Sequence, residues 1–169
     1  IEDNNGDVLR EMAPFKIKEI DPAIAFIIND ILSDNFARIS AFETGSSLEI
    51  PGYKVAVKTW TTNDKKDNWT IGYTPEFLVT VWVGNNDNTP MNPYLTSGIT
   101  GAAPIWNRVM SYLLKNYGAG NKWYEEPDNI VEKNCYFGRK EYFVRGTENS
   151  ANCSQGSLAS PTPKPQITF

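Results

Sequence analysis

Residues 55–62 read Val55-Ala56-Val57-Lys58-Thr59-Trp60-Thr61-Thr62. This run is rich in β-branched residues and therefore predicts a strand. A side-chain period of two puts Lys58, Trp60 and Thr62 on one face, and Thr59 and Thr61 on the other. An ammonium group held on a strand beside hydroxyls and free backbone N–H groups can bind a carboxylate and stabilise a developing oxyanion. The stretch is therefore a predicted strand and the candidate functional site of the chain.

Helix and strand signals surround this predicted strand. Asp21 as N-cap and Pro22 at the first helical position predict the start of a helix. Residues 35–52 are rich in turn formers and predict a surface connection. Further strands are predicted at residues 69–74 and 77–84, and the second is predicted to be central in its sheet because it is almost entirely apolar. The first helix is predicted to bury an isoleucine-rich stripe against this sheet, formed by Ile24, Ile27, Ile28, Ile31 and Leu32.

A second helix is predicted to open at Pro104 and to end at Gly118. Its side chains at helical spacing predict one apolar face, formed by Ile105, Val109, Tyr112 and Leu113. Trp106 and Met110 are predicted to be core residues, because aromatic and methionine side chains at this spacing usually pack inside.

The two cysteines, Cys135 and Cys153, flank a segment with two glycines and several charges. This arrangement favours a disulfide that closes a surface loop in an oxidising compartment, and two unpaired thiols are the alternative. Residues 118–155 are therefore predicted to form a small appendage. The proline-, serine- and threonine-rich residues 156–169 are predicted to be a disordered tail. At the other end, Asn4-Asn5-Gly6-Asp7 predicts a hairpin turn.

The composition argues against several classes of function. The net charge is −4, and no lysine or arginine cluster with interleaved aromatics occurs, so no nucleic-acid partner is predicted. The chain has no histidine and two cysteines, which excludes a Ser-His-Asp triad and a structural zinc site within it. No metal and no cofactor are predicted. No apolar run is long enough to cross a bilayer, so any leader or membrane anchor is expected upstream.

Beyond these patterns the chain resembles a known family. Lys58-Thr59-Trp60-Thr61-Thr62 and its continuation to Pro75 are similar to the Lys-Thr-Gly-Thr-Thr strand of penicillin-binding proteins, the serine transpeptidases that cross-link peptidoglycan. Trp60 stands where the family has glycine. The resemblance to the class A, bifunctional members extends to four other segments, which are residues 5–9, 21–23, 77–87 and 101–106.

The resemblance implies an α/β (α+β) fold, in which an antiparallel sheet is flanked by helices. Residues 1–117 would form the C-terminal portion of the transpeptidase fold that penicillin-binding proteins share with serine β-lactamases. It also implies a catalytic role for Lys58, which would lower the proton affinity of the neighbouring hydroxyl of the family's Ser-x-Asn motif and help bind the substrate carboxylate. A second catalytic role is implied for Thr61, whose backbone N–H would be an oxyanion donor. Substrate-binding positions are implied at Thr59, Trp60, Thr61 and Thr62.

The implied reaction is D,D-transpeptidation of peptidoglycan stem peptides by serine acyl transfer. No Ser-x-x-Lys occurs in the chain, so the nucleophile is missing and the segment is predicted to be inactive without the N-terminal half of the same polypeptide. Ser33-Asp34-Asn35 matches the family's Ser-x-Asn motif literally, but it ends a helical run close before Lys58, and it is interpreted as a helix end. β-Lactams would be ligands, and a bacterial extracytoplasmic, cell-envelope location is implied. The alternative function is a non-catalytic, cell-wall-associated binding domain.

Trp60 is the departure from the family pattern. A glycine at this position lets the strand approach the helix that carries the nucleophile, whereas tryptophan is expected to cause overpacking or to displace the strand. Three explanations are open: an altered or inactive enzyme, an engineered or erroneous residue, or packing space that exists because the nucleophile's helix is absent.

Overall fold

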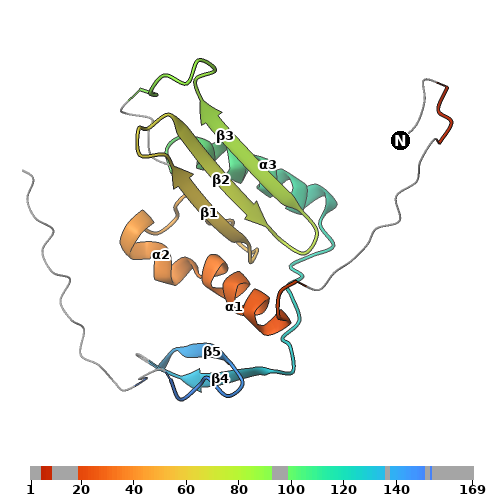
Figure 1. Ribbon diagram of the computed structural model, residues 1–169, viewed down its shortest axis with the longest axis vertical. Helices are drawn as coiled ribbons and strands as arrows, with labels where there is room; N and C mark the ends of the chain where they lie inside the picture. Colours follow the sequence, from red (N-terminus) through yellow and green to blue (C-terminus); the bar gives the residue numbers. More distant parts are fainter. Residues whose placement is uncertain (1–4, 9–18, 93–98, 136–137, 151–152, 154–169) are drawn as a thin grey trace, which may run out of the picture.

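The computed structural model describes residues 5–8, 19–92, 99–135, 138–150 and 153. An antiparallel sheet of three strands has one helix across its back and a pair of helices beside it, and a two-stranded sheet lies below the pair (Figure 1). This mixed architecture of antiparallel sheets and helices confirms the predicted fold class. The elements in chain order are α1 (Pro22–Ser33), α2 (Asn35–Phe42), β1 (Ala56–Thr61), β2 (Asp67–Tyr73), β3 (Leu78–Gly84), α3 (Ala102–Tyr117), β4 (Ile130–Asn134) and β5 (Lys140–Val144).

The strand order in the main sheet is β1-β2-β3. The prediction that residues 77–84 form a central strand is therefore wrong for the described sheet, in which β2 is central and β3 lies at an edge. An apolar composition indicates that the faces of a strand are covered, but it does not show which strands lie on either side. In β3 one of the two faces is not covered by the described residues, since Leu78 and Trp82 are exposed.

Helix α3 covers one face of this sheet and forms the main core with it. Trp106 is fully buried against Gly72 of β2. A Cβ atom at Gly72 would lie 2.3 Å from Cζ2 of the Trp106 ring, so the close approach of helix and strand requires glycine there. The core prediction for Trp106 and Met110 is confirmed, since both are fully buried.

The apolar face predicted for α3 is not the face that the helix buries. The helix begins at Ala102, two residues before Pro104, and has Gly118 at its C-cap as expected. Its buried side chains include Trp106, Met110 and Leu114, at a spacing of four residues. The sequence offers two apolar stripes, and the bulkier one fills the space above the sheet. The residues predicted to share one apolar face are exposed or only partly buried, and they are Ile105, Val109, Tyr112 and Leu113.

Helix α1 starts as predicted, because Oδ1 of Asp21 accepts a hydrogen bond of 2.8 Å from the backbone N–H of Ala23. The prediction for its buried face is wrong. Ala23 and Phe26 are buried instead. The Phe26 ring packs edge-on against Tyr142 of β5 at a centroid distance of 5.2 Å. The isoleucines that remain exposed are Ile24, Ile28 and Ile31.

Residues 35–42 form helix α2, although the sequence predicted a surface connection over residues 35–52. Asp34 supplies the missing signal as N-cap, since its Oδ1 accepts a 2.9 Å hydrogen bond from the N–H of Ala37. Ser33 is the last residue of α1, and its Oγ donates to the carbonyl of Asp30 at 3.0 Å. The structure thus places Ser33 and Asp34 at a helix end, as the sequence interpretation expects.

Parts of the predictions concern residues that the structure does not describe. The predicted tail at residues 156–169 and the first residue of the predicted hairpin, Asn4, both lie outside the described ranges. Within those ranges, no helix combines the length and apolarity that crossing a membrane requires.

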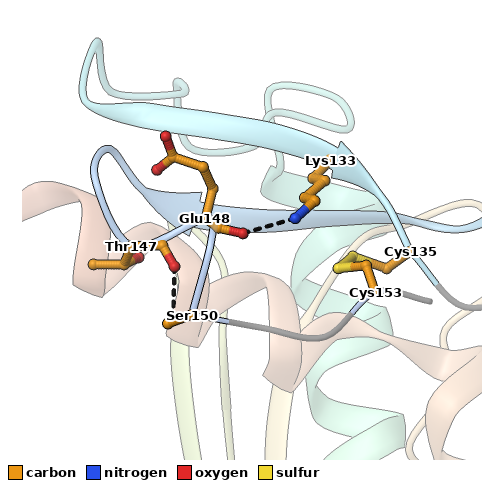
Figure 2. Close-up of a disulfide and its surroundings, with 6 residues drawn as sticks. All are labelled: Lys133, Cys135, Thr147, Glu148, Ser150 and Cys153. Atoms are coloured by element: carbon orange, nitrogen blue, oxygen red, sulfur yellow. Dashed lines mark hydrogen bonds between the residues drawn. A yellow bond between two sulfur atoms is a disulfide. The ribbon is translucent and has the colours of Figure 1, made fainter.

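Strands β4 and β5 form the small sheet next to α1, and Cys135, the residue after β4, is joined to Cys153 by a disulfide (Figure 2). Figure 2 shows how the turn after β5 is held near this link. The Nζ of Lys133 donates to the carbonyl of Glu148 at 2.9 Å, and the Oγ of Ser150 donates to the carbonyl of Thr147 at 2.6 Å. Covalent and polar links therefore hold the segment that follows β5 against β4.

Replacing both cysteines by serine is expected to destabilise this small unit by about 3 kcal/mol, because the loop between them would regain conformational entropy in the unfolded state. Hydrogen exchange of the β4 and β5 amides, with and without dithiothreitol, measures the effect. Reductant should accelerate exchange in the wild type and leave the double serine variant unchanged. Equal exchange in the oxidised wild type and the variant would contradict the prediction.

Candidate functional site

The side chains of β1 alternate as the sequence predicts. Lys58 and Trp60 are exposed, whereas Val57 and Thr59 are buried towards α3. The predicted site residues therefore divide between the two faces of one strand. Lys58 and Trp60 share the face opposite α3, and Thr59 and Thr61 share the other.

The backbone of β1 presents hydrogen-bonding groups at a free edge. The N–H of Thr62 donates to the carbonyl of Asp67 at 3.1 Å, and Thr61 is paired with Asn68 in the register. In an antiparallel pair the backbone groups of alternate residues point to the same side, so Trp60 is bonded to β2 and the N–H and C=O groups of Thr59 and Thr61 point away from it. Because β1 is the edge strand of the described sheet, these groups pair with no described strand and point to the side on which α1 and α2 lie (Figure 1).

The ammonium group of Lys58 lies at this same edge. Its Nζ donates a hydrogen bond to the carbonyl oxygen of Thr59, one of the groups that point away from β2. A positive charge and the outward N–H of Thr61 thus lie along one strand edge. Together they offer a cation and a neutral donor to an anionic group placed beside the strand.

Two hollows border Lys58. One, of about 550 Å³, lies over the exposed face of the sheet and is lined by Lys58, Thr59, Trp60, Trp69 and Ile71. The other, of about 240 Å³, lies between β1 and the α1–α2 pair, with Val57, Lys58 and Thr59 on its sheet side. The free edge of β1 is therefore accessible from both sides of the lysine.

Trp60 is 65% exposed, on the face away from α3. The expected overpacking around it does not occur among the described residues, because its side chain projects from the uncovered face. It belongs to a row of three tryptophans, since the register pairs Trp60 with Trp69 and Trp69 with Trp82. The rings of Trp69 and Trp82 are 6.4 Å apart, and Nε1 of Trp82 donates to Oδ1 of Asp67 at 2.8 Å.

Thr62 and Thr61 use their hydroxyls within the protein. Oγ1 of Thr62 accepts from the N–H groups of Lys66 and Asp67, at 3.1 and 3.0 Å, and so holds the turn between β1 and β2. Oγ1 of Thr61 accepts from Nδ2 of Asn68 at 3.3 Å. Asn68 was not recognised from the sequence, where it looks like an ordinary residue of a charged loop.

At the opposite end of the sheet, β2 is bonded to α1. The hydroxyl of Tyr73 donates to Oδ1 of Asn29 at 2.8 Å. Burial raises the pKa of this hydroxyl, which favours its neutral, hydrogen-donating form. This contact fixes the helix that borders the second hollow beside Lys58.

Comparison with solved structures identifies the class of fold. The crystal structure of penicillin-binding protein 1A from Haemophilus influenzae, at 2.6 Å resolution, is similar with a TM-score of 0.51 and 32% identity. The similarity covers 56% of this chain and 15% of that one. The described sheet and helices therefore share their fold with part of a penicillin-binding protein. No protein-family model matches the chain.

Curated relatives agree with this fold. Penicillin-binding protein 1A of Clostridium acetobutylicum is 32% identical over 164 residues, which are 97% of this chain and 18% of the relative. Penicillin-binding protein 1A/1B of Bacillus subtilis is 28% identical over 182 residues, which cover 89% of this chain and 19% of the relative. The chain is thus homologous to class A penicillin-binding proteins over most of its length, which confirms the resemblance found in the sequence. It spans less than a fifth of the length of these two relatives.

Proposed function

We propose that this chain is the C-terminal portion of a peptidoglycan D,D-transpeptidase domain and forms one wall of its active site. The observation that carries the proposal is the free edge of β1, where the outward N–H of Thr61 and the ammonium of Lys58 lie together on a strand homologous to penicillin-binding proteins. Residues 1–117 would belong to the transpeptidase domain. Residues 118–155 would be an appendage to it, and residues 156–169 a tail.

In the proposed mechanism a serine from the N-terminal half of the polypeptide attacks the penultimate D-alanine carbonyl of a stem peptide. D-Alanine leaves, and an amine from a neighbouring strand releases the acyl group from the serine. Lys58 would bind the substrate carboxylate and favour deprotonation of a serine hydroxyl placed next to it. The N–H of Thr61 would donate to the oxyanion of the tetrahedral intermediate, a contact that stabilises the charge as it develops.

The same proposal includes four substrate-binding residues. Two of them would act through the backbone and two through their side chains, and they are Thr59, Trp60, Thr61 and Thr62. The outward C=O and N–H groups of Thr59 and Thr61 can bond to an extended peptide laid along the edge of β1. Trp60 would contact the substrate through the hollow over the sheet face. Thr62 would act indirectly, because its hydroxyl holds the β1–β2 turn.

The rest of the polypeptide would supply the nucleophile and cover the face of the sheet opposite α3. That face carries several exposed apolar side chains, and such a patch is typical of a surface that packs against another unit. A stem peptide and β-lactams would be the ligands, and the enzyme would act outside the cytoplasm at the cell envelope. The exposed apolar residues of this face are Trp60, Ile71, Leu78 and Trp82.

Covalent labelling by a fluorescent penicillin tests the proposal. The complete polypeptide should be labelled on a serine outside this chain, and the isolated chain, which has no Ser-x-x-Lys, should not be labelled. Trp60 favours a second candidate, a non-catalytic domain that binds cell wall, because a tryptophan occupies the position of the family's glycine beside Lys58. Binding of purified peptidoglycan by a complete protein that takes no penicillin label would select this second function.

Trp60→Gly is expected to increase the rate of penicillin acylation of the complete protein. Removing the indole opens the space beside Lys58 for the helix that carries the nucleophile, and a mispositioned nucleophile can cost about 100-fold in rate. Trp82→Ala is the matched control, since it removes an exposed indole from the same face but from the opposite edge strand. An unchanged rate in Trp60→Gly would show that the complete protein accommodates Trp60.

A further inference from the structure

Asn68 is a fully buried polar side chain next to Thr61, the proposed oxyanion donor. It is 0% exposed, lies on β2 on the face covered by α3, and is the cross-strand partner of Thr61. Since Thr61 forms no backbone hydrogen bonds to β2, the two side chains approach closely in this pair. The amide Nδ2 of Asn68 donates to Oγ1 of Thr61 at 3.3 Å.

The other end of the same amide is bonded to helix α3. Oδ1 of Asn68 accepts a 2.9 Å hydrogen bond from the N–H of Ala102, the first residue of the helix. The N-cap position of α3 is Gly101, which has no side chain to accept a bond. Asn68 therefore satisfies a free N–H of the first turn in place of an N-cap side chain.

These contacts connect three elements through one buried side chain. Strand β1 has a neighbouring strand on one side only within the described sheet, so the position of its last residues depends on β2 and on side-chain contacts. Helix α3 is in turn anchored on the sheet by fully buried Trp106. The amide of Asn68 thus links the free strand end to helix α3.

We propose that Asn68 is a positioning residue for the oxyanion-binding strand, acting through the hydroxyl of Thr61 to fix the direction of the Thr61 N–H. This inference rests on the proposed transpeptidase function. An oxyanion donor is effective only when its direction is set before charge develops, so a loosened strand end slows the chemical step more than it weakens binding.

Acylation kinetics of the complete protein test this role. Asn68→Leu keeps a side chain of similar size and removes both hydrogen bonds. It should reduce the limiting acylation rate by about tenfold or more, with a smaller change in the dissociation constant of the non-covalent penicillin complex. Thr61→Val, which removes the hydroxyl and keeps the backbone N–H, should show the same pattern. Because both substitutions remove the same contact, the double variant should lose little more than the more affected single variant.

Asn107→Leu is the matched control. The side-chain amide of Asn107 links α3 to the loop before β1, because its Nδ2 donates to the carbonyls of Ser47 and Glu49 at 3.0 and 2.9 Å. These two bonds do not involve β1. This variant should lose stability and keep its limiting acylation rate. Equal losses of rate in Asn107→Leu and Asn68→Leu would overturn the inference, and so would fully additive losses in the double variant.

Hydrogen exchange separates failure of this inference from failure of the proposed function. Asn68→Leu should accelerate exchange in residues 56–61 of the complete protein, and Asn107→Leu should not. Unchanged exchange in that segment would overturn the positioning role even if the enzyme is active. Absence of penicillin labelling in both the wild type and Trp60→Gly would instead refute the transpeptidase assignment on which this inference rests.

Discussion

Lys58→Ala in the complete protein is expected to lower the rate of penicillin acylation by about 100-fold or more. The substitution removes a side-chain cation that, among the described residues, borders both hollows beside the free edge of β1. The substrate carboxylate would lose its counter-charge, and a neighbouring serine would lose the positive field that favours its deprotonation. The measurement is time-resolved labelling with fluorescent penicillin at several concentrations.

Lys115→Ala is the control for this prediction. Lys115 is an exposed lysine in the last turn of α3 and lines neither hollow beside Lys58. The Lys115→Ala substitution removes the same charge from the protein and should leave the rate of acylation unchanged. Lys58→Arg adds a stricter test, because it keeps the charge but changes the geometry of the donors. Wild-type rates in Lys58→Ala would remove β1 from the proposed active site.

Trp106→Ala is expected to lower the free energy of unfolding by about 3–5 kcal/mol, the usual cost of deleting a buried aromatic ring. The indole is fully buried between α3 and Gly72, so its loss leaves a cavity where helix and sheet approach most closely. Denaturant unfolding of the complete protein, followed by tryptophan fluorescence and by circular dichroism, measures the change.

Tyr112→Ala is the matched comparison on the same helix. Tyr112 is also a large aromatic residue of α3, but its side chain is exposed, so its replacement should cost less than about 1 kcal/mol. Gly72→Ala should also destabilise the protein, but by overpacking and not by leaving a cavity, since the added methyl group would clash with the Trp106 ring. If Trp106→Ala and Tyr112→Ala were equally stable, α3 would not pack on the sheet as described.

Local signals in the sequence were sufficient for β1 and for the start of α1, but not for α2. Alternation located Lys58 and Trp60 on one face of β1, and the Asp21-Pro22 pair located the start of α1, because both features depend on near neighbours in the chain. On α3, residue type predicted Trp106 and Met110 as core residues, but the close packing of Trp106 on Gly72 could not be read from near neighbours. Two apolar stripes run along that helix, and the choice between them depends on the space above Gly72, which is created by residues far away in the sequence.

Long-range contacts also explain what the sequence did not reveal about the candidate site. Asn68 has no recognisable motif, since its importance comes from Thr61 on the next strand and Ala102 on a distant helix. The lateral position of β3 is likewise a property of the whole sheet. By contrast, the family resemblance implied that the Thr61 N–H is an oxyanion donor, but the direction of this N–H required the register between β1 and β2.

The unpaired edge of β1 can bind a ligand, but it can also promote aggregation. A row of backbone donors and acceptors without a neighbouring strand can pair with another extended polypeptide, including a second copy of the same chain. If the rest of the polypeptide is removed, nothing among the described residues shields Thr59 and Thr61 by strand pairing on that side. The isolated piece would therefore tend to assemble edge to edge as its concentration rises, through the very atoms proposed to receive the substrate.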